Sequence, residues 1–233
     1  MSYNIEPIGY IRNSYKDKFG IPRQSNLVKN TESTIIFNEK YRDDNSLRGL
    51  EGYSHIWLLW IFSQTDSQKG WSVTVRPPRL GGNKRMGVFS TRSPYHPNRI
   101  GLSCVKIKSI EKTKEYGSVI TVLGADLLDG TPIIDIKPYL TISDCYPEAV
   151  CGFSDENADY RLKVDIPDDI SLQFSDKTLS EISSILSYDP RPSYHESPER
   201  IYSMTYDIFN IRFIVENRVL KVIEIKKMNG SEE

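Results

Sequence analysis

The stretch SHIWLLWIF (residues 54–62) is the most apolar run in the chain. Glycine stands before it at position 52, and the polar residues Ser63, Gln64 and Thr65 follow it. A short apolar run with such boundaries fits the length of a strand better than that of a helix. The run therefore predicts a strand that is buried on both faces and forms the centre of the core.

Short segments rich in β-branched and aromatic residues surround this central strand. They lie at residues 5–11, 34–37, 71–75, 102–110 and 118–123. A doubly wound sheet would need helical segments of about ten to fifteen residues between its strands, and these are missing here. No GxGxxG motif follows a strand, which disfavours a Rossmann domain. Because closure removes exposed sheet edges, the pattern predicts an antiparallel β-barrel.

The composition changes towards the C-terminus. Residues 146–168 are acidic and broken by proline and glycine, and we interpret them as a linker between domains at 1–145 and 169–233. In the second domain Ser175 can cap a helix, and residues 208–225 fit a terminal β-hairpin. The sequence thus predicts a mainly β protein with a small α+β C-terminal domain.

The stretch VRPPRLGGNKRMGVFSTRSPYHPNRIGLS (residues 75–103) is basic and rich in turns. Between Arg76 and Arg99 it holds six Lys or Arg and no Asp or Glu, with four prolines and three glycines. Proline removes a backbone donor and glycine is costly to order, so the stretch cannot be one helix or one central strand. Such a loop can hold backbone N–H and guanidinium groups in a concave array that suits an anion. The competing interpretation is a solvated connection without a ligand.

The overall charge limits the kind of partner. The 233 residues carry a net charge of −1, and since the basic stretch contributes +6, the rest carries −7. This asymmetry predicts a local anion-binding face on an acidic body. No apolar run approaches a membrane span, and the N-terminus does not resemble a signal peptide, which predicts a cytoplasmic protein without a membrane contact. Three cysteines without zinc-like spacing indicate a reducing compartment and no metal site.

Five motifs, in chain order, resemble those of the TsaA/TrmO family. They are PRQ (22–24), VRPPRLGGN (75–83), GVFSTRS (87–93), PNRIGLS (97–103) and the segment from DGTP to DIKPY (129–139). A sixth, DPRP (189–192), resembles the C-terminal domain of the two-domain bacterial members. The resemblance implies a TsaA-like β-barrel that works as a homodimer. It also implies an S-adenosylmethionine-dependent methyltransferase whose substrate is tRNA, acting on the exocyclic N6 of threonylcarbamoyladenosine next to the anticodon.

The resemblance also implies where the cofactor binds. Matching the motifs residue by residue gives the S-adenosylmethionine contacts as Pro22, Arg23, Gln24, Ser63, Gln64, Arg92, Leu102, Asp129, Gly130, Thr131 and Pro132. Arg and Gln donors suit the carboxylate of this cofactor, and an Asp suits its ammonium, sulfonium or ribose. Two positions depart from the family pattern. Ser63 stands where a histidine is common, and His96 stands where an arginine is usual.

Methyl transfer from a sulfonium requires an aligned donor and a nucleophile that has lost its proton. Asp135 and Tyr139 are our candidates for the base, although Asp135 could instead hold an arginine of the basic stretch. The predicted substrate-binding residues supply positive charge, a stacking ring or amide groups: Arg76, Arg79, Arg85, His96, Asn98, Arg191 and Tyr194. The alternative function is a non-catalytic RNA- or anion-binding β-barrel module, which would bind no cofactor and depend steeply on salt.

Overall fold

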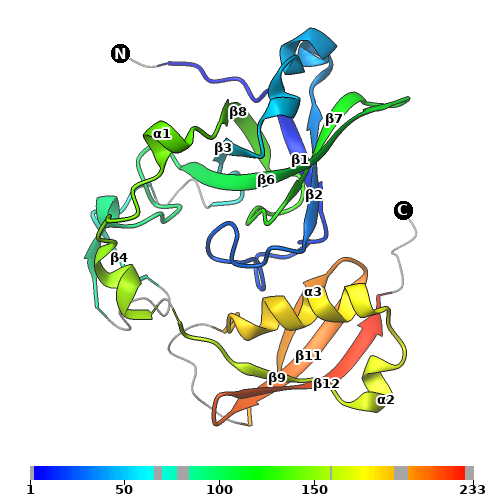
Figure 1. The fold of residues 1–233 in the computed structure, drawn as a ribbon. Coiled ribbons are helices and arrows are strands. Elements are labelled where there is room, and N and C mark those ends of the chain that lie inside the picture. Colours follow the sequence, from blue (N-terminus) through cyan, green and yellow to red (C-terminus); the bar gives the residue numbers. More distant parts are fainter. Residues whose placement is uncertain (1–2, 66–69, 78–83, 158, 192–198, 229–233) are drawn as a thin grey trace.

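The computed structural model describes residues 3–65, 70–77, 84–157, 159–191 and 199–228, and it contains two packed units (Figure 1). The N-terminal unit is built on six strands, which hydrogen-bond in the order β1-β2-β7-β6-β3-β8. Pairing of β1 with β8 closes the ring, so the strands form a barrel in which every neighbouring pair is antiparallel. These strands are β1 (Gly9–Asn13), β2 (Glu32–Phe37), β3 (His55–Ile61), β6 (Ile100–Thr113), β7 (Gly117–Leu123) and β8 (Pro132–Pro138). The mainly β class is as predicted.

The central strand β3 is buried on one face only. Ile56, Leu58 and Trp60 point into the barrel and are buried, whereas the alternating side chains, such as Trp57 and Leu59, are half-buried on the outer wall. The prediction of burial on both faces was wrong because a closed ring has a single interior, so half of each strand faces outward. The apolar outer side chains are only partly covered, and the indole of Trp57 donates a hydrogen bond to Asp144 at 2.8 Å.

The connections between barrel strands contain short elements. The predicted strand at 71–75 shrinks to the two residues of β4, which pairs with β5 in a small hairpin. The polar segment after β2 forms 3-10 turns. The connecting elements are η1 (Glu39–Tyr41), η2 (Asp44–Leu47), η3 (Leu50–Gly52), β4 (Thr74–Val75), β5 (Met86–Gly87), η5 (Val88–Ser90), α1 (Thr141–Asp144) and η6 (Gly152–Asn157).

The C-terminal unit is a sheet covered by one helix. Its strand order is β10-β11-β12-β9, with β9 parallel to β12 and the other pairs antiparallel. Ser175 caps α3, as the sequence predicted, because its Oγ accepts a hydrogen bond from the Thr178 amide at 3.2 Å. The elements are β9 (Lys163–Asp165), α2 (Asp168–Ser171), α3 (Asp176–Ser187), β10 (Tyr202–Tyr206), β11 (Phe209–Glu216) and β12 (Val219–Lys227).

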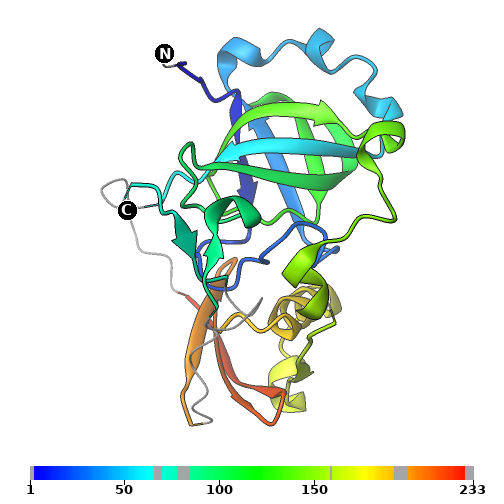
Figure 2. The ribbon, with the colours of Figure 1, turned by 90° about the vertical axis from the view of Figure 1, so that its left-hand side faces the viewer.

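The segment between β1 and β2 joins the two units (Figures 1 and 2). Although it leaves the barrel, its residues Tyr15 and Val28 are buried in the apolar cluster of the C-terminal unit. The Tyr15 ring meets the Tyr206 ring edge-on, with 5.6 Å between centroids. This segment carries the predicted motif at 22–24, so both units hold that motif in place. In the part of the chain that the structure describes, no helix is long and apolar enough to cross a membrane.

Candidate functional site

Two of the predicted cofactor motifs meet directly. Arg92 Nη1 donates a hydrogen bond of 2.8 Å to Gln24 Oε1, across 68 residues of sequence. Gln24 is half-buried and Arg92 is exposed, so one side of the pair is anchored and the other is accessible. Pro22, in the same motif as Gln24, is buried. An amide and a guanidinium brought together in this way offer several N–H donors to one carboxylate.

Arg23 points towards the C-terminal unit. Its Nη2 donates to the main-chain oxygen of Arg191 at 3.3 Å. Ser63 and Gln64 follow β3 and are exposed, and the main-chain oxygen of Gln64 accepts from Lys18 Nζ at 2.6 Å. The segment between β1 and β2 thus contacts both the loop after β3 and the C-terminal unit.

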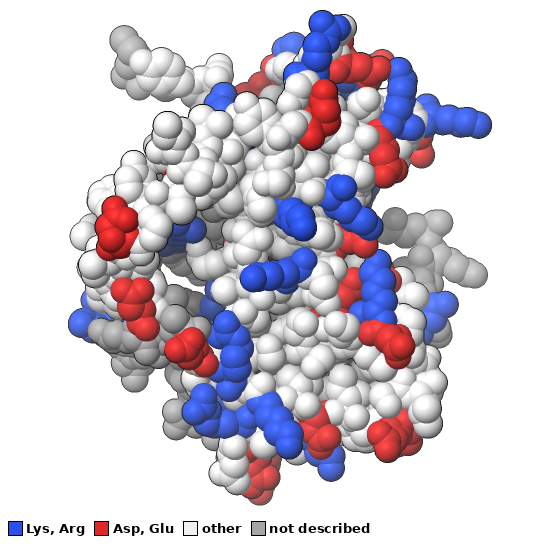
Figure 3. All heavy atoms as spheres, viewed as in Figure 1, with Lys and Arg blue, Asp and Glu red and all other residues white. Residues whose placement is uncertain are grey.

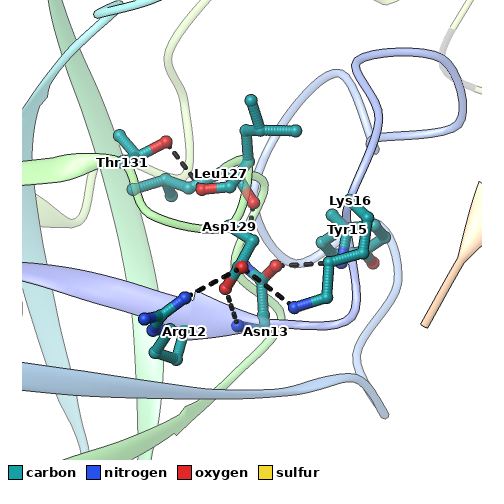
Figure 4. Close-up of polar contacts among 8 residues, drawn as sticks. Arg12, Asn13, Tyr15, Lys16, Leu127, Asp129 and Thr131 are labelled. Atoms are coloured by element: carbon teal, nitrogen blue, oxygen red, sulfur yellow. Dashed lines mark hydrogen bonds and ion pairs between the residues drawn. The ribbon is translucent and has the colours of Figure 1, made fainter. Parts of the chain in front are cut away.

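The turn that contains Asp129 is held by β1 and the segment after it (Figure 4). The Asp129 carboxylate accepts from Lys16 Nζ at 2.9 Å, from the Asn13 amide at 2.9 Å, and from Arg12 Nη1 at 3.4 Å. Burial opposes ionisation, but these three donors outweigh it and hold the pKa of Asp129 below its ordinary value. The carboxylate is therefore charged at neutral pH and already paired.

The rest of this turn is equally fixed. Thr131 is buried, and its Oγ1 donates to the main-chain oxygen of Leu128 at 2.6 Å. Gly130 has a φ of 76°, a left-handed conformation that favours glycine over other residues. Pro132 follows as the first residue of β8. The predicted cofactor residue Leu102 lies elsewhere, half-exposed on the outer wall opposite Leu59.

A second aspartate of this connection escaped the sequence reasoning. Asp126 Oδ1 accepts from Ser103 Oγ at 2.5 Å, and Ser103 Oγ accepts from the buried indole Nε1 of Trp60 at 3.0 Å. Burial raises the pKa of Asp126 to about 6, against the opposing effects of Ser103 and of the Arg92 charge. No local signal in the sequence marks Asp126, because its environment depends on Ser103 and Arg92 from other parts of the chain.

The two candidates for the base lie on β8 and just beyond it. Asp135 Oδ2 pairs with Lys137 Nζ at 2.8 Å, and among the described residues its ion-pair partner is this lysine and not an arginine of the basic stretch. The Tyr139 ring lies 6.0 Å from the Trp57 ring, and partial burial together with the Cys145 thiol raises the pKa of Tyr139. The raised pKa keeps the Tyr139 phenol protonated at neutral pH. Both roles remain predictions.

Most of the predicted substrate residues lie on the insert between β3 and β6. Arg76, Arg85 and Asn98 are exposed there, and Arg85 Nε donates to Thr74 Oγ1 at 2.9 Å. His96 donates through Nε2 to the Thr91 carbonyl at 2.9 Å. Two further members of the predicted set, Arg79 and Tyr194, lie outside the described residues.

Arg191 requires a correction. Its guanidinium makes two hydrogen bonds to Asp189, of 2.8 and 3.0 Å, and the two side chains are only 8% and 0% exposed. Tyr160 donates a third hydrogen bond to the same carboxylate at 3.0 Å. A substrate carboxylate could reach Arg191 only by breaking this buried pair. We therefore assign Arg191 to the structure of the C-terminal unit rather than to substrate binding.

The insert also presents aromatic side chains to solvent. Phe89 is 75% and Trp71 is 53% exposed, and their rings stack with 6.5 Å between centroids and 25° between planes. His96 approaches Phe89 edge-on at 5.6 Å. Figure 3 shows a hollow between the lobe that carries β4 and the rest of the molecule. We call Trp71, Phe89 and His96, together with the exposed Arg85 of the same insert, the aromatic face.

Comparison with known proteins agrees with this architecture. The model of the tRNA-methyltransferase O N-terminal domain matches residues 10–145, and the model of the TrmO C-terminal domain matches residues 161–228. These matches define a two-domain protein of the tRNA-methyltransferase O kind. The chain belongs to the TrmO family, which confirms the resemblance seen in its motifs.

Named relatives extend along almost the whole chain. The tRNA (adenine(37)-N6)-methyltransferase of Escherichia coli is 40% identical over 97% of this chain and 98% of that protein. A putative S-adenosylmethionine-dependent methyltransferase of Pseudomonas aeruginosa is 36% identical over 88% of this chain and 89% of that protein. The crystal structure of TrmO from P. aeruginosa has a TM-score of 0.79 at 29% identity, covering 97% of this chain and 98% of that one.

Proposed function

We propose that this protein is an S-adenosylmethionine-dependent methyltransferase that modifies N6 of adenosine 37 in tRNA, and that threonylcarbamoyladenosine is the nucleoside it accepts. The observation that carries the proposal is the Gln24–Arg92 hydrogen bond, which brings two cofactor motifs together. The names of the Escherichia coli and Pseudomonas aeruginosa relatives support the same activity.

The chemistry of the donors fits this cofactor. Bound S-adenosylmethionine supplies an electrophilic methyl group on a sulfonium. The exposed guanidinium of Arg92 and the amide of Gln24 would bind its carboxylate, because both offer N–H donors in fixed positions. Leu102 is half-exposed on the outer wall opposite Leu59 and would offer an apolar contact from there. The task of these residues is to orient the donor, since an in-line displacement depends mainly on alignment.

Titration calorimetry with S-adenosylmethionine tests the cofactor assignment. We expect saturable binding by the natural protein and a dissociation constant about tenfold to a hundredfold higher for Arg92→Ala, since a hydrogen bond to a charged group contributes about 1.5–3 kcal/mol. Arg48→Ala is the matched control, because Arg48 is an exposed arginine on the turn after η2. Equal affinity of the Arg92→Ala variant and the natural protein for S-adenosylmethionine would contradict the assignment of the cofactor to this site.

The substrate assignment rests on a methyl-transfer assay. We expect tRNA that carries threonylcarbamoyladenosine to accept methyl groups, and the same tRNA without this modification to accept none. The runner-up function, a non-catalytic RNA-binding module, predicts tRNA binding with a steep salt dependence and no transfer to either tRNA. Transfer to the unmodified tRNA at an equal rate would contradict the proposed substrate.

The aromatic face is the surface we assign to the anticodon loop. Exposed aromatic rings beside arginines stack unpaired bases, each contributing about 1–3 kcal/mol. Phe89→Ala should therefore weaken tRNA binding about tenfold, while the salt dependence stays the same because no charge changes. Leu172→Ala removes another exposed apolar side chain, on the C-terminal unit, and should leave binding unchanged. Filter binding at several salt concentrations measures both quantities, and equal affinities would exclude this surface.

We also propose the domain boundaries, the assembly and the compartment. The boundary at 145 is supported by two separate apolar clusters and by a family-model match that ends there. The C-terminal boundary lies earlier than the predicted 168, because β9 (Lys163–Asp165) pairs with β12 and the second family-model match begins at 161. A homodimer is our expectation for the assembly, and a strict monomer in sedimentation would contradict it. The tRNA substrate and the free thiols of all three cysteines support a role in the cytoplasm.

A further inference from the structure

A chain of hydrogen bonds fixes the carboxylate of Asp126. The indole N–H of Trp60 can only donate, so Ser103 Oγ accepts from it at 3.0 Å. The single proton of the Ser103 hydroxyl is then directed to Asp126 Oδ1, at 2.5 Å. Trp60 and Ser103 are both buried, on neighbouring strands β3 and β6, so a rigid part of the barrel wall sets the orientation of this carboxylate.

Asp126 also lies where the predicted cofactor segments converge. The backbone amide of Ser25, which directly follows the motif at 22–24, and the charge of Arg92 both act on its carboxylate. Its partner Ser103 directly follows Leu102, and Asp126 itself stands three residues before Asp129. Within the described part of the chain, the side-chain hydrogen bond to this carboxylate comes from Ser103 and ends on Oδ1. The amides of Ser25 and Asp126 also donate to the carboxylate, and since each of its oxygens has two lone pairs, it can still accept one further proton.

We propose that Asp126 is the general base of methyl transfer, and that Ser103 and Trp60 are positioning residues that hold its carboxylate. This inference rests on the proposed function. The new N6–CH3 bond forms as the S–CH3 bond of the donor breaks, and that electron pair stays on sulfur. The N6 proton passes to the Asp126 carboxylate and is later released to solvent. Charge balances, because the sulfonium becomes a neutral thioether as the carboxylate gains a proton.

The electrostatics agree with this role. A pKa near 6 leaves the Asp126 carboxylate ionised at neutral pH yet more basic than an ordinary aspartate, which suits a general base. The groups that face it are the Arg92 guanidinium, the Ser103 hydroxyl, the Ser25 amide and the Tyr15 phenol. Burial raises the pKa of Tyr15 well above its usual range, so this phenol stays neutral and Asp126 is the group that titrates.

The first test compares two isosteric substitutions. Asp126→Asn should lower kcat/KM about 10²–10⁴-fold, the usual contribution of a general base, and leave the affinity for S-adenosylmethionine unchanged. Asp144→Asn is the matched control, because Asp144 also accepts an indole hydrogen bond, from Trp57 at 2.8 Å. Near-natural turnover of Asp126→Asn would overturn the inference, as would a loss confined to cofactor affinity, which would make Asp126 a cofactor ligand.

The pH profile separates a base from a structural residue. For the natural enzyme we expect kcat/KM to fall as the pH drops through about 6 and Asp126 becomes protonated. Ser103→Ala removes a hydrogen bond that lowers this pKa, so the acid limb should move to higher pH, while Asp126→Asn should lack it. If Ser103→Ala lowered kcat/KM by the same factor at every pH, the positioning role of Ser103 would be overturned. An inactive natural protein would overturn the proposed function and this inference together, whereas an unaltered limb in an active Asp126→Asn variant would overturn the inference alone.

Discussion

Replacing Asp189 with alanine should lower the free energy of unfolding by about 3–5 kcal/mol, the usual effect of removing one partner of a buried ion pair. The reason is that Arg191, 8% exposed, would keep its charge in the interior without the two hydrogen bonds that Asp189 provides. Tyr160 would also lose the acceptor of its hydroxyl. Urea or thermal unfolding followed by circular dichroism measures the change.

An exposed pair in the same unit is the control. Glu224→Ala breaks the Arg212–Glu224 pair, and because both side chains reach solvent it should cost less than about 1 kcal/mol. The double substitution Asp189→Leu with Arg191→Met should recover part of the lost stability, since apolar residues can replace a buried pair at little net cost. Recovery is incomplete because Tyr160 still lacks its acceptor and position 189 has a left-handed φ of 52°. Equal effects of Asp189→Ala and Glu224→Ala would show that burial does not strengthen the first pair.

Asp189→Ala should also affect the predicted cofactor site. Arg23 donates to the main-chain oxygen of Arg191, and the next residue, Gln24, accepts from Arg92. If the loop of Asp189 and Arg191 shifts, the motif at 22–24 loses one of its supports. We expect weaker binding of S-adenosylmethionine by Asp189→Ala at a temperature where the variant is folded. The C-terminal unit would then act as a support for the cofactor motif, besides any contact with tRNA.

Local patterns in the sequence predicted the elements that depend on near neighbours. The helix α3 was visible because Ser175 can cap it and apolar residues recur at helical spacing. The β6–β7 hairpin followed from two strand-like runs around a turn. The sequence also predicted that cationic side chains gather on the insert between β3 and β6, because these arginines and lysines lie close together along the chain.

Long-range packing was not predictable in the same way. Nothing local indicated that Tyr15 and Val28 belong to the core of the C-terminal unit, because their burial depends on strands that begin more than 170 residues later. Arg191 looked like an available cation in a Pro-Arg motif, and only the fold reveals its pairing with Asp189. Asp126 was overlooked for the same reason, since its pKa depends on burial and on Ser103 from another strand.

Gly101→Ala is the second substitution for which we expect a large effect. A Cβ at this position would lie 2.5 Å from Trp60 Cδ2 and closer still to Cε2, so the indole would have to move. Overpacking of this kind costs about 1–3 kcal/mol, and we expect the upper end because an indole in a closed barrel has little room to shift. Gly87→Ala is the control, since its Cβ would meet only Ser90 Oγ, at 3.9 Å.

The displaced indole connects this stability effect to catalysis. Trp60 Nε1 orients Ser103, and Ser103 orients Asp126, so movement of the ring should loosen the carboxylate as well as the core. Gly101→Ala should therefore lower kcat/KM and shift its acid limb, even where the variant is fully folded. Adding Trp60→Phe should relieve part of the overpacking, because the smaller ring leaves space for the new methyl group. A folded Gly101→Ala variant with a natural pH profile would show that the indole does not control the carboxylate.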